Sequence, residues 1–120
     1  MRIDLFKFFI IFCCTGLGGV LRYLISFIPY LKSLDSGVLL SNIIACAIMG
    51  YLLAIPINNP MVKMGVVSLC GGLSTFSGYI VFSCLSSHGP GNSILYHVMS
   101  VGFGLLFFIG SYYSCKSLFA

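Results

Sequence analysis

Charged residues are scarce in this sequence. Only 7% of its 120 residues are Asp, Glu, Lys or Arg, whereas soluble domains carry about 25%. The chain therefore has too few charged side chains to cover a water-facing globule. Hydrophobic residues make up 59% of it, and its mean hydropathy is +1.11. This composition excludes a soluble domain and predicts an integral membrane protein.

Acidic residues are almost missing. The chain has no Glu, and its two Asp residues, Asp4 and Asp35, lie outside the long apolar segments. Small drug–proton antiporters have a similar length and four helices, but they need a carboxylate inside the membrane. That class is excluded. An enzyme is not expected either, because no His, Cys or carboxylate cluster has catalytic spacing, and we place His88 and His97 in or beside a solvated loop.

Neither the cysteines nor the positive net charge of the chain indicates a binding site. The six cysteines are scattered through apolar segments without a C-x-x-C pair, and inside a membrane helix Cys behaves as a small hydrophobic residue. The net charge of +4 comes from basic residues that form no cluster. Nucleic acid is therefore excluded as a partner.

Four apolar segments are long enough to cross a bilayer, which takes about 20 residues per helix. Long unbroken runs satisfy their backbone hydrogen bonds as helices rather than as a barrel. We predict helices at about residues 8–28, 37–57, 64–85 and 94–114, joined by short connectors that contain Pro, Gly and Asn. The predicted fold is an all-α membrane protein with one four-helix domain over residues 1–120.

The basic residues are distributed unevenly between the two sides of such a bundle. Four spans place both termini on one side, which collects Arg2, Lys7, Lys63 and Lys116, whereas the other side has Lys32. The positive-inside rule therefore favours cytoplasmic termini.

Arg22 is the ionisable residue expected within a helix. It follows Gly16 and Gly19 at three-residue intervals in GLGGVLRY, and these glycines would let another backbone approach closely. A charge inside a membrane helix usually faces protein or a water-filled cavity. An Arg near a helix end can instead extend to the interface, and both interpretations stay open.

The third apolar segment contains CGGLSTFSGY, residues 70–79, with three glycines and three Ser or Thr hydroxyls. Paired glycines make the backbone permissive, and broken membrane helices place ion sites at the bilayer midplane. We predict a helix broken at mid-membrane, whose carbonyls near Gly71 and Ser74 could hold a small cation. Phe76 and Tyr79 would share one helical face and present ring edges to an anion, or would simply pack.

The second and fourth segments add polar residues at four-residue steps. Asn42 is followed at this spacing by Cys46 and Gly50, and Tyr96 is followed by Ser100. Such stripes line an ion path or form hydrogen bonds between helices.

Taken in order, the segments GGVLRY, SGVLLSN and LCGGLSTFSGY, together with Tyr96 and Ser100, resemble the CrcB/Fluc family of fluoride channels. The resemblance covers essentially the whole chain, and the broken-helix motif is its most specific part. It implies a channel in the plasma membrane of a prokaryote that exports fluoride down its electrochemical gradient and so lowers fluoride toxicity. It also implies an antiparallel, dual-topology dimer with a structural sodium ion at the dimer interface.

The resemblance further assigns roles to individual residues. The implied fluoride path is lined by Asn42, Phe76, Tyr79, Tyr96 and Ser100. The implied sodium ligands are the backbone carbonyls of Gly71 and Ser74, and Arg22 takes the place of the conserved basic residue with a structural or electrostatic role.

The chain also departs from the usual residues of that family at several positions. These are Val38, Ser68, Gly78, Tyr79 and Phe82, where Thr, Gly, Thr, Phe and often Glu are usual. The departures and the four-to-one distribution of basic residues fit one member of an oppositely oriented hetero-pair. A self-sufficient homodimer and a non-transporting membrane assembly subunit stay open as alternatives.

Overall fold

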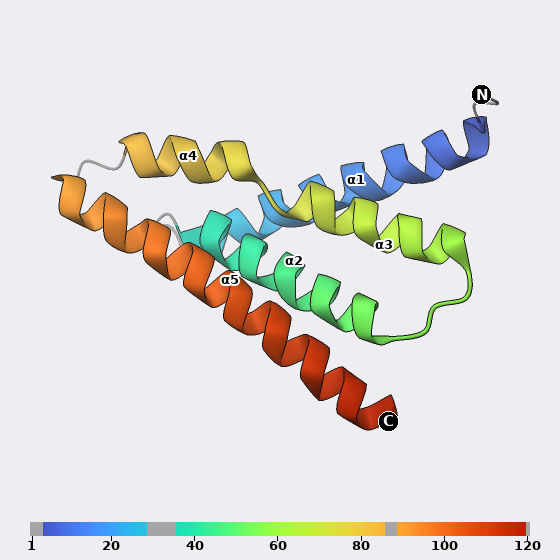
Figure 1. Cartoon of the computed structure of the whole chain (residues 1–120). Coiled ribbons are helices and arrows are strands. Elements are labelled where there is room, and N and C mark those ends of the chain that lie inside the picture. Colours follow the sequence, from blue (N-terminus) through green and yellow to red (C-terminus); the bar gives the residue numbers. More distant parts are fainter. Residues whose placement is uncertain (1–3, 29–35, 86–88, 120) are drawn as a thin grey trace.

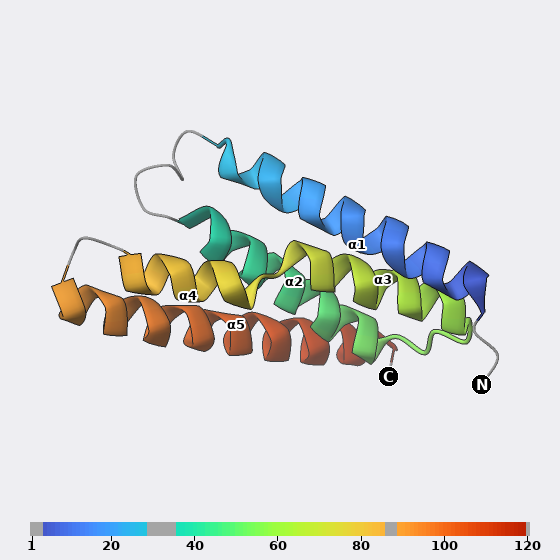
Figure 2. The ribbon, with the colours of Figure 1, turned by 90° about the horizontal axis from the view of Figure 1, so that it is seen from above.

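The computed structural model describes residues 4–28, 36–85 and 89–119, and all regular structure within these ranges is α-helical. The helices are α1 (Leu5–Ser26), α2 (Ser36–Ala54), α3 (Pro60–Leu73), α4 (Phe76–Leu85) and α5 (Gly89–Phe119). They form an elongated bundle in which the start of α1 and the end of α5 lie at the same end (Figures 1 and 2). Arg2, Lys32, Asp35 and His88 lie outside the described residues.

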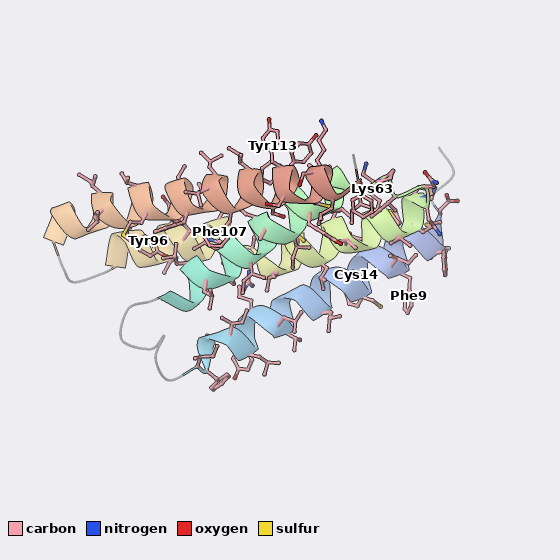
Figure 3. All side chains as sticks on the ribbon, turned by 90° about the horizontal axis from the view of Figure 1, so that it is seen from below. Phe9, Cys14, Lys63, Tyr96, Phe107 and Tyr113 are labelled. Atoms are coloured by element: carbon pink, nitrogen blue, oxygen red, sulfur yellow. The ribbon has the colours of Figure 1, made fainter. Side chains whose placement is uncertain are left out.

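Within the part of the chain that the structure describes, four helical segments are long and apolar enough to cross a membrane: Leu5–Ser26, Gly37–Ala54, Pro60–Val81 and Ile94–Phe119. The third segment runs through α3 into α4, so these two short helices contribute to one candidate crossing. Large apolar side chains cover the outside of the bundle, and Figure 3 shows Phe9 and Tyr113 pointing away from it. The predicted all-α fold with four candidate membrane spans is confirmed.

The helix ends differ from the predicted ranges for local reasons. Helix α3 begins at Pro60, rather than at residue 64, because the Asn59 side chain caps it by accepting from the Met61 N–H at 2.9 Å. Helix α2 ends at Ala54, short of residue 57, because Pro56 disfavours a helical backbone conformation at the residue before it, Ile55. Helix α5 extends beyond the predicted 94–114 at both ends.

The helices pack mainly as two pairs, α1 with α3 and α2 with α5 (Figure 1). Helix α2 also contacts α1, α3 and α4, so it touches every other helix. Ala45 of α2 packs with Cys70 and Leu73 of α3 in the buried hydrophobic cluster. Helix α2 is therefore the centre of the subunit.

Glycine allows direct backbone contact between α1 and α3. A Cβ atom on Gly18 would collide with the carbonyl oxygen of Leu69, and one on Gly72 would collide with the carbonyl oxygen of Thr15. Small residues permit this close approach between membrane helices. The α1–α3 crossing thus depends on the lack of side chains at two facing positions.

The predicted close-approach face of α1 makes no close contact within this chain. An added Cβ at Gly16 or Gly19 would meet no heavy atom within 4 Å, whereas Gly18 lies against α3. The reason is rotational: around the helix, Gly18 lies about 100° from Gly19 and about 160° from Gly16. The flat surface at Gly16 and Gly19 faces outward.

Candidate functional site

A groove of about 550 Å³ lies between α2, the residues that join α3 to α4, and α5. It brings together Asn42 from α2, Phe76 and Tyr79 from α4, and Ser100 from α5. The structure therefore gathers four of the five predicted path residues around one space. Phe76 is 76% exposed, so this wall of the groove is open to the outside of the subunit.

Tyr96, the fifth predicted path residue, is connected to the groove through Tyr79. The two rings stack, with centroids 5.8 Å apart and planes 25° apart. Tyr79 also contacts the rings of Phe76, at 5.8 Å, and His97, at 4.8 Å. Tyr79 is thus the centre of an aromatic cluster between α4 and α5.

The expectation that His97 sits in or beside a solvated loop is wrong. It lies inside α5, is half-buried, and has its ring against Tyr79. The prediction failed because α5 begins at Gly89, five residues earlier than predicted, which moves His97 from the helix end into its body.

Ser74 and Thr75 separate α3 from α4. Ser74 has extended backbone angles, φ −78° and ψ 154°, and its N–H closes the end of α3 by donating to the Cys70 carbonyl at 2.9 Å. The Thr75 hydroxyl accepts from the Gly78 N–H at 3.1 Å. This is the bond of a helix N-cap, in which Thr is favoured, so the local sequence ends one helix and starts the next.

The side-chain amide of Asn42 forms hydrogen bonds with both backbone polar groups of Thr75, its N–H and its carbonyl. The Thr75 N–H donates to Asn42 Oδ1 at 2.8 Å, and Asn42 Nδ2 donates to the Thr75 carbonyl at 3.4 Å. Sequence reasoning did not select Thr75 as a site residue. Its capping role can be recognised from a Thr that precedes a helix, but its pairing with Asn42, 33 residues away, cannot.

Arg22 contacts the same junction from α1. Its Nη1 donates to the Ser74 carbonyl at 3.1 Å, and the residue is half-buried. Its side chain is therefore directed at the protein and not along the surface. The guanidinium therefore occupies one of the two acceptor positions of the Ser74 carbonyl.

The Gly71 carbonyl lies in the last turn of α3, and Gly71 is exposed. Within the described residues, no group of three or more His, Cys, Asp or Glu side chains could hold a metal ion. The oxygens near this junction belong to backbone carbonyls and to the side chains of Asn42, Ser74 and Thr75.

A sequence model of the family described as "CrcB-like protein, Camphor Resistance (CrcB)" matches residues 9–112. The chain belongs to the CrcB family. It is 33% identical over 108 residues to the fluoride-specific ion channel FluC 2 of Staphylococcus saprophyticus, covering 83% of this chain and 88% of that protein. It is 32% identical over 112 residues to FluC 1 of Staphylococcus aureus strain Mu50, covering 88% and 76%.

A third relative is matched over a shorter region. The chain is 40% identical over 67 residues to the fluoride-specific ion channel FluC 2 of Staphylococcus haemolyticus, and the match covers 52% of this chain and about half, 55%, of that protein. Together with the four apolar helices, family membership identifies a multi-pass membrane protein of a bacterium.

Proposed function

We propose that this chain forms a fluoride-selective channel, and not an enzyme, that exports fluoride from the bacterial cytoplasm down its electrochemical gradient and lowers fluoride toxicity. One observation carries this proposal. In a CrcB family member whose relatives are named fluoride-specific ion channels, an amide, a hydroxyl and two aromatic rings from three helices line a single groove.

The groove offers the chemistry that a fluoride ion needs when it leaves water. A narrow path must replace the hydration shell by successive weak contacts, because one deep site would trap the ion. The Asn42 amide has two N–H donors, of which one points to Thr75, and the other is available to the groove. The Ser100 hydroxyl supplies a further hydrogen-bond donor, and the ring edges of Phe76 and Tyr79 supply the positive ends of their quadrupoles.

Tyr96 and Arg22 would act at the margins of this path. Tyr96 extends the series of polar and aromatic groups along α5 through its stacking on Tyr79. Arg22 places a half-buried positive charge beside Ser74, which itself lines the groove. A positive charge at that place favours entry of an anion.

Two exposed faces of the chain are available to a second subunit. The Phe76 ring is largely exposed, and the Gly16 and Gly19 surface of α1 is open. We propose an antiparallel, dual-topology dimer that covers these faces, with α3 and α4 as the halves of one helix broken at mid-membrane. The basic residues favour cytoplasmic termini if the orientation is fixed. The partner is a second copy or, as the FluC 1 and FluC 2 names among the relatives suggest, a homologous chain.

A structural sodium ion at the dimer interface would suit the backbone oxygens of the junction. Gly71 is exposed, and the Ser74 carbonyl keeps a second lone pair beside the one that Arg22 occupies. Two carbonyls from one chain are too few for a hard cation, so a second subunit would supply the remaining ligands. The bound ion would supply positive charge that holds the two junctions together.

The channel proposal predicts fluoride flux from purified protein in liposomes. With a fluoride-selective electrode, we expect efflux of fluoride and retention of chloride from the same vesicles. Flux from this chain alone supports the homodimer. Flux only after a homologous partner is added supports the hetero-pair, and no flux in either case leaves a non-transporting assembly subunit.

The sodium proposal predicts that removing sodium weakens the assembly. We expect replacement of sodium by N-methyl-D-glucamine on both sides of the membrane to reduce fluoride flux and to dissociate the dimer more readily in detergent. Potassium at the same ionic strength serves as the control for general salt effects. Unchanged flux and unchanged dimer stability in the organic cation would contradict a structural role for sodium.

A further inference from the structure

The amide of Asn42 replaces a hydrogen bond that a continuous helix would make. In an α-helix the Thr75 N–H would donate to the carbonyl four residues earlier, which is that of Gly71. Here the Thr75 N–H donates to Asn42 Oδ1 at 2.8 Å. The Gly71 carbonyl has therefore lost its helical donor to a side chain of α2.

The position of the Gly71 carbonyl favours a positive ligand. It belongs to the last turn of the 14-residue helix α3, where unpaired carbonyls carry the negative end of the helix dipole. Gly71 is exposed, and an atom at its Cβ position would meet no heavy atom within 4 Å. The oxygen thus combines the loss of the Thr75 donor with partial negative charge in an exposed residue.

The backbone groups of Ser74 and Thr75 are paired within the chain. The Ser74 carbonyl accepts from Arg22, and the Thr75 carbonyl accepts from Asn42. Buried backbone polar groups require such partners. Ser74 and Thr75 are therefore held by protein groups, while the Gly71 carbonyl is left without the Thr75 donor because the side chain of Asn42 takes it.

We propose, on the basis of the channel function above, that Asn42 is a positioning residue for the cation site as well as a donor in the anion path. Its Oδ1 diverts the Thr75 N–H and so frees the Gly71 carbonyl for a hard cation such as sodium. Its Nδ2 faces Thr75 and the groove. One amide thereby couples the fluoride path to the cation site.

The carbonyl of Gly71 can be observed directly. The sequence contains two Gly–Gly pairs, Gly18–Gly19 and Gly71–Gly72. Full-length protein labelled with ¹³C-carbonyl, ¹⁵N-glycine and placed in lipid nanodiscs should give two cross-peaks in an HNCO spectrum. We expect sodium, added in place of N-methyl-D-glucamine, to shift the Gly71 carbonyl resonance and to leave that of Gly18 in place as an internal control.

Two substitutions at Asn42 separate the positioning role from the pore role. In Asn42→Ala the Thr75 N–H can return to Gly71, so we expect the Gly71 carbonyl resonance to move downfield without sodium and its sodium response to be lost. Asn42→Asp keeps an acceptor oxygen, so the sodium response should persist. Phe76→Ile, a groove substitution that leaves the Asn42–Thr75 pair intact, should also keep it.

Several results would overturn this inference. They are an unshifted Gly71 resonance in Asn42→Ala, a retained sodium response in that variant, a lost response in folded Asn42→Asp, or no sodium response in the wild type. If Asn42→Ala does not fold, as judged by circular dichroism and gel filtration, Asn42→Leu, which also lacks the acceptor oxygen and is close to Asn in size, takes its place. Fluoride flux measured on the same wild-type preparation tests the channel function separately, so the two failures are distinguishable.

Discussion

Replacing Asn42 with Asp is expected to reduce fluoride flux by roughly a hundredfold or more. Asn42 lines the groove, and Asp has the same size but carries a negative charge. Two like charges 4 Å apart repel by about 4 kcal/mol at an effective dielectric constant of about 20. Each 1.4 kcal/mol corresponds to about a tenfold change, so even a partly screened charge would exclude the anion. Liposome efflux with a fluoride electrode measures the effect.

Asn59→Asp is the matched control for this substitution. Asn59 caps α3 from the connector before it, is exposed, and lies away from the residues that line the groove. Asp caps helices as well as Asn does, so we expect folding and flux close to those of the wild type. Wild-type flux in folded Asn42→Asp protein would remove Asn42 from the fluoride path.

Gly72→Ala is expected to have the largest effect on folding. The new Cβ would collide with the backbone carbonyl of Thr15, and backbone atoms in the middle of a helix cannot rotate away as a side chain can. Overpacking costs about 1–3 kcal/mol, and occasionally more. We expect a lower thermal midpoint in detergent and a smaller yield of folded protein, because α1 and α3 must separate to admit the methyl group.

Gly102→Ala provides the comparison. Gly102 lies within α5, and a Cβ there would meet no heavy atom within 4 Å. Ala also has the higher helix propensity. We expect its thermal midpoint to equal or slightly exceed that of the wild type. A Gly72→Ala protein as stable as Gly102→Ala would show that the α1–α3 crossing tolerates a wider separation.

The number and kind of helices could be predicted because they depend on local hydrophobicity. Each apolar segment is long enough to require its own crossing, whatever its neighbours are. The ends of the helices were harder to predict because capping residues determine them. The predicted start at residue 64 ignored Asn59 and Pro60, which together begin α3 four residues earlier and include Lys63 in the helix.

The packing of the site could not be predicted because it depends on how helices rotate against one another. The sequence places Gly16, Gly18 and Gly19 within one turn of α1, but only the tertiary arrangement selects Gly18 for contact with α3. Likewise, the polarity of Asn42 indicates that it needs partners, but not that both its amide groups meet Thr75. The sequence thus identifies polar residues that need hydrogen-bond partners, but only the tertiary arrangement of the helices shows which residues those partners are.

The pairing order of the helices has a consequence for the synthesis of the chain. Helix α1 packs mainly on α3, and α2 packs mainly on α5, where the Ser111 hydroxyl donates to the Ala47 carbonyl at 2.6 Å. Neither main pair joins helices that are consecutive along the chain. During synthesis, Asn42 of α2 therefore cannot bond to Thr75 until 33 further residues have been made, and α2 cannot pack on α5 until later still.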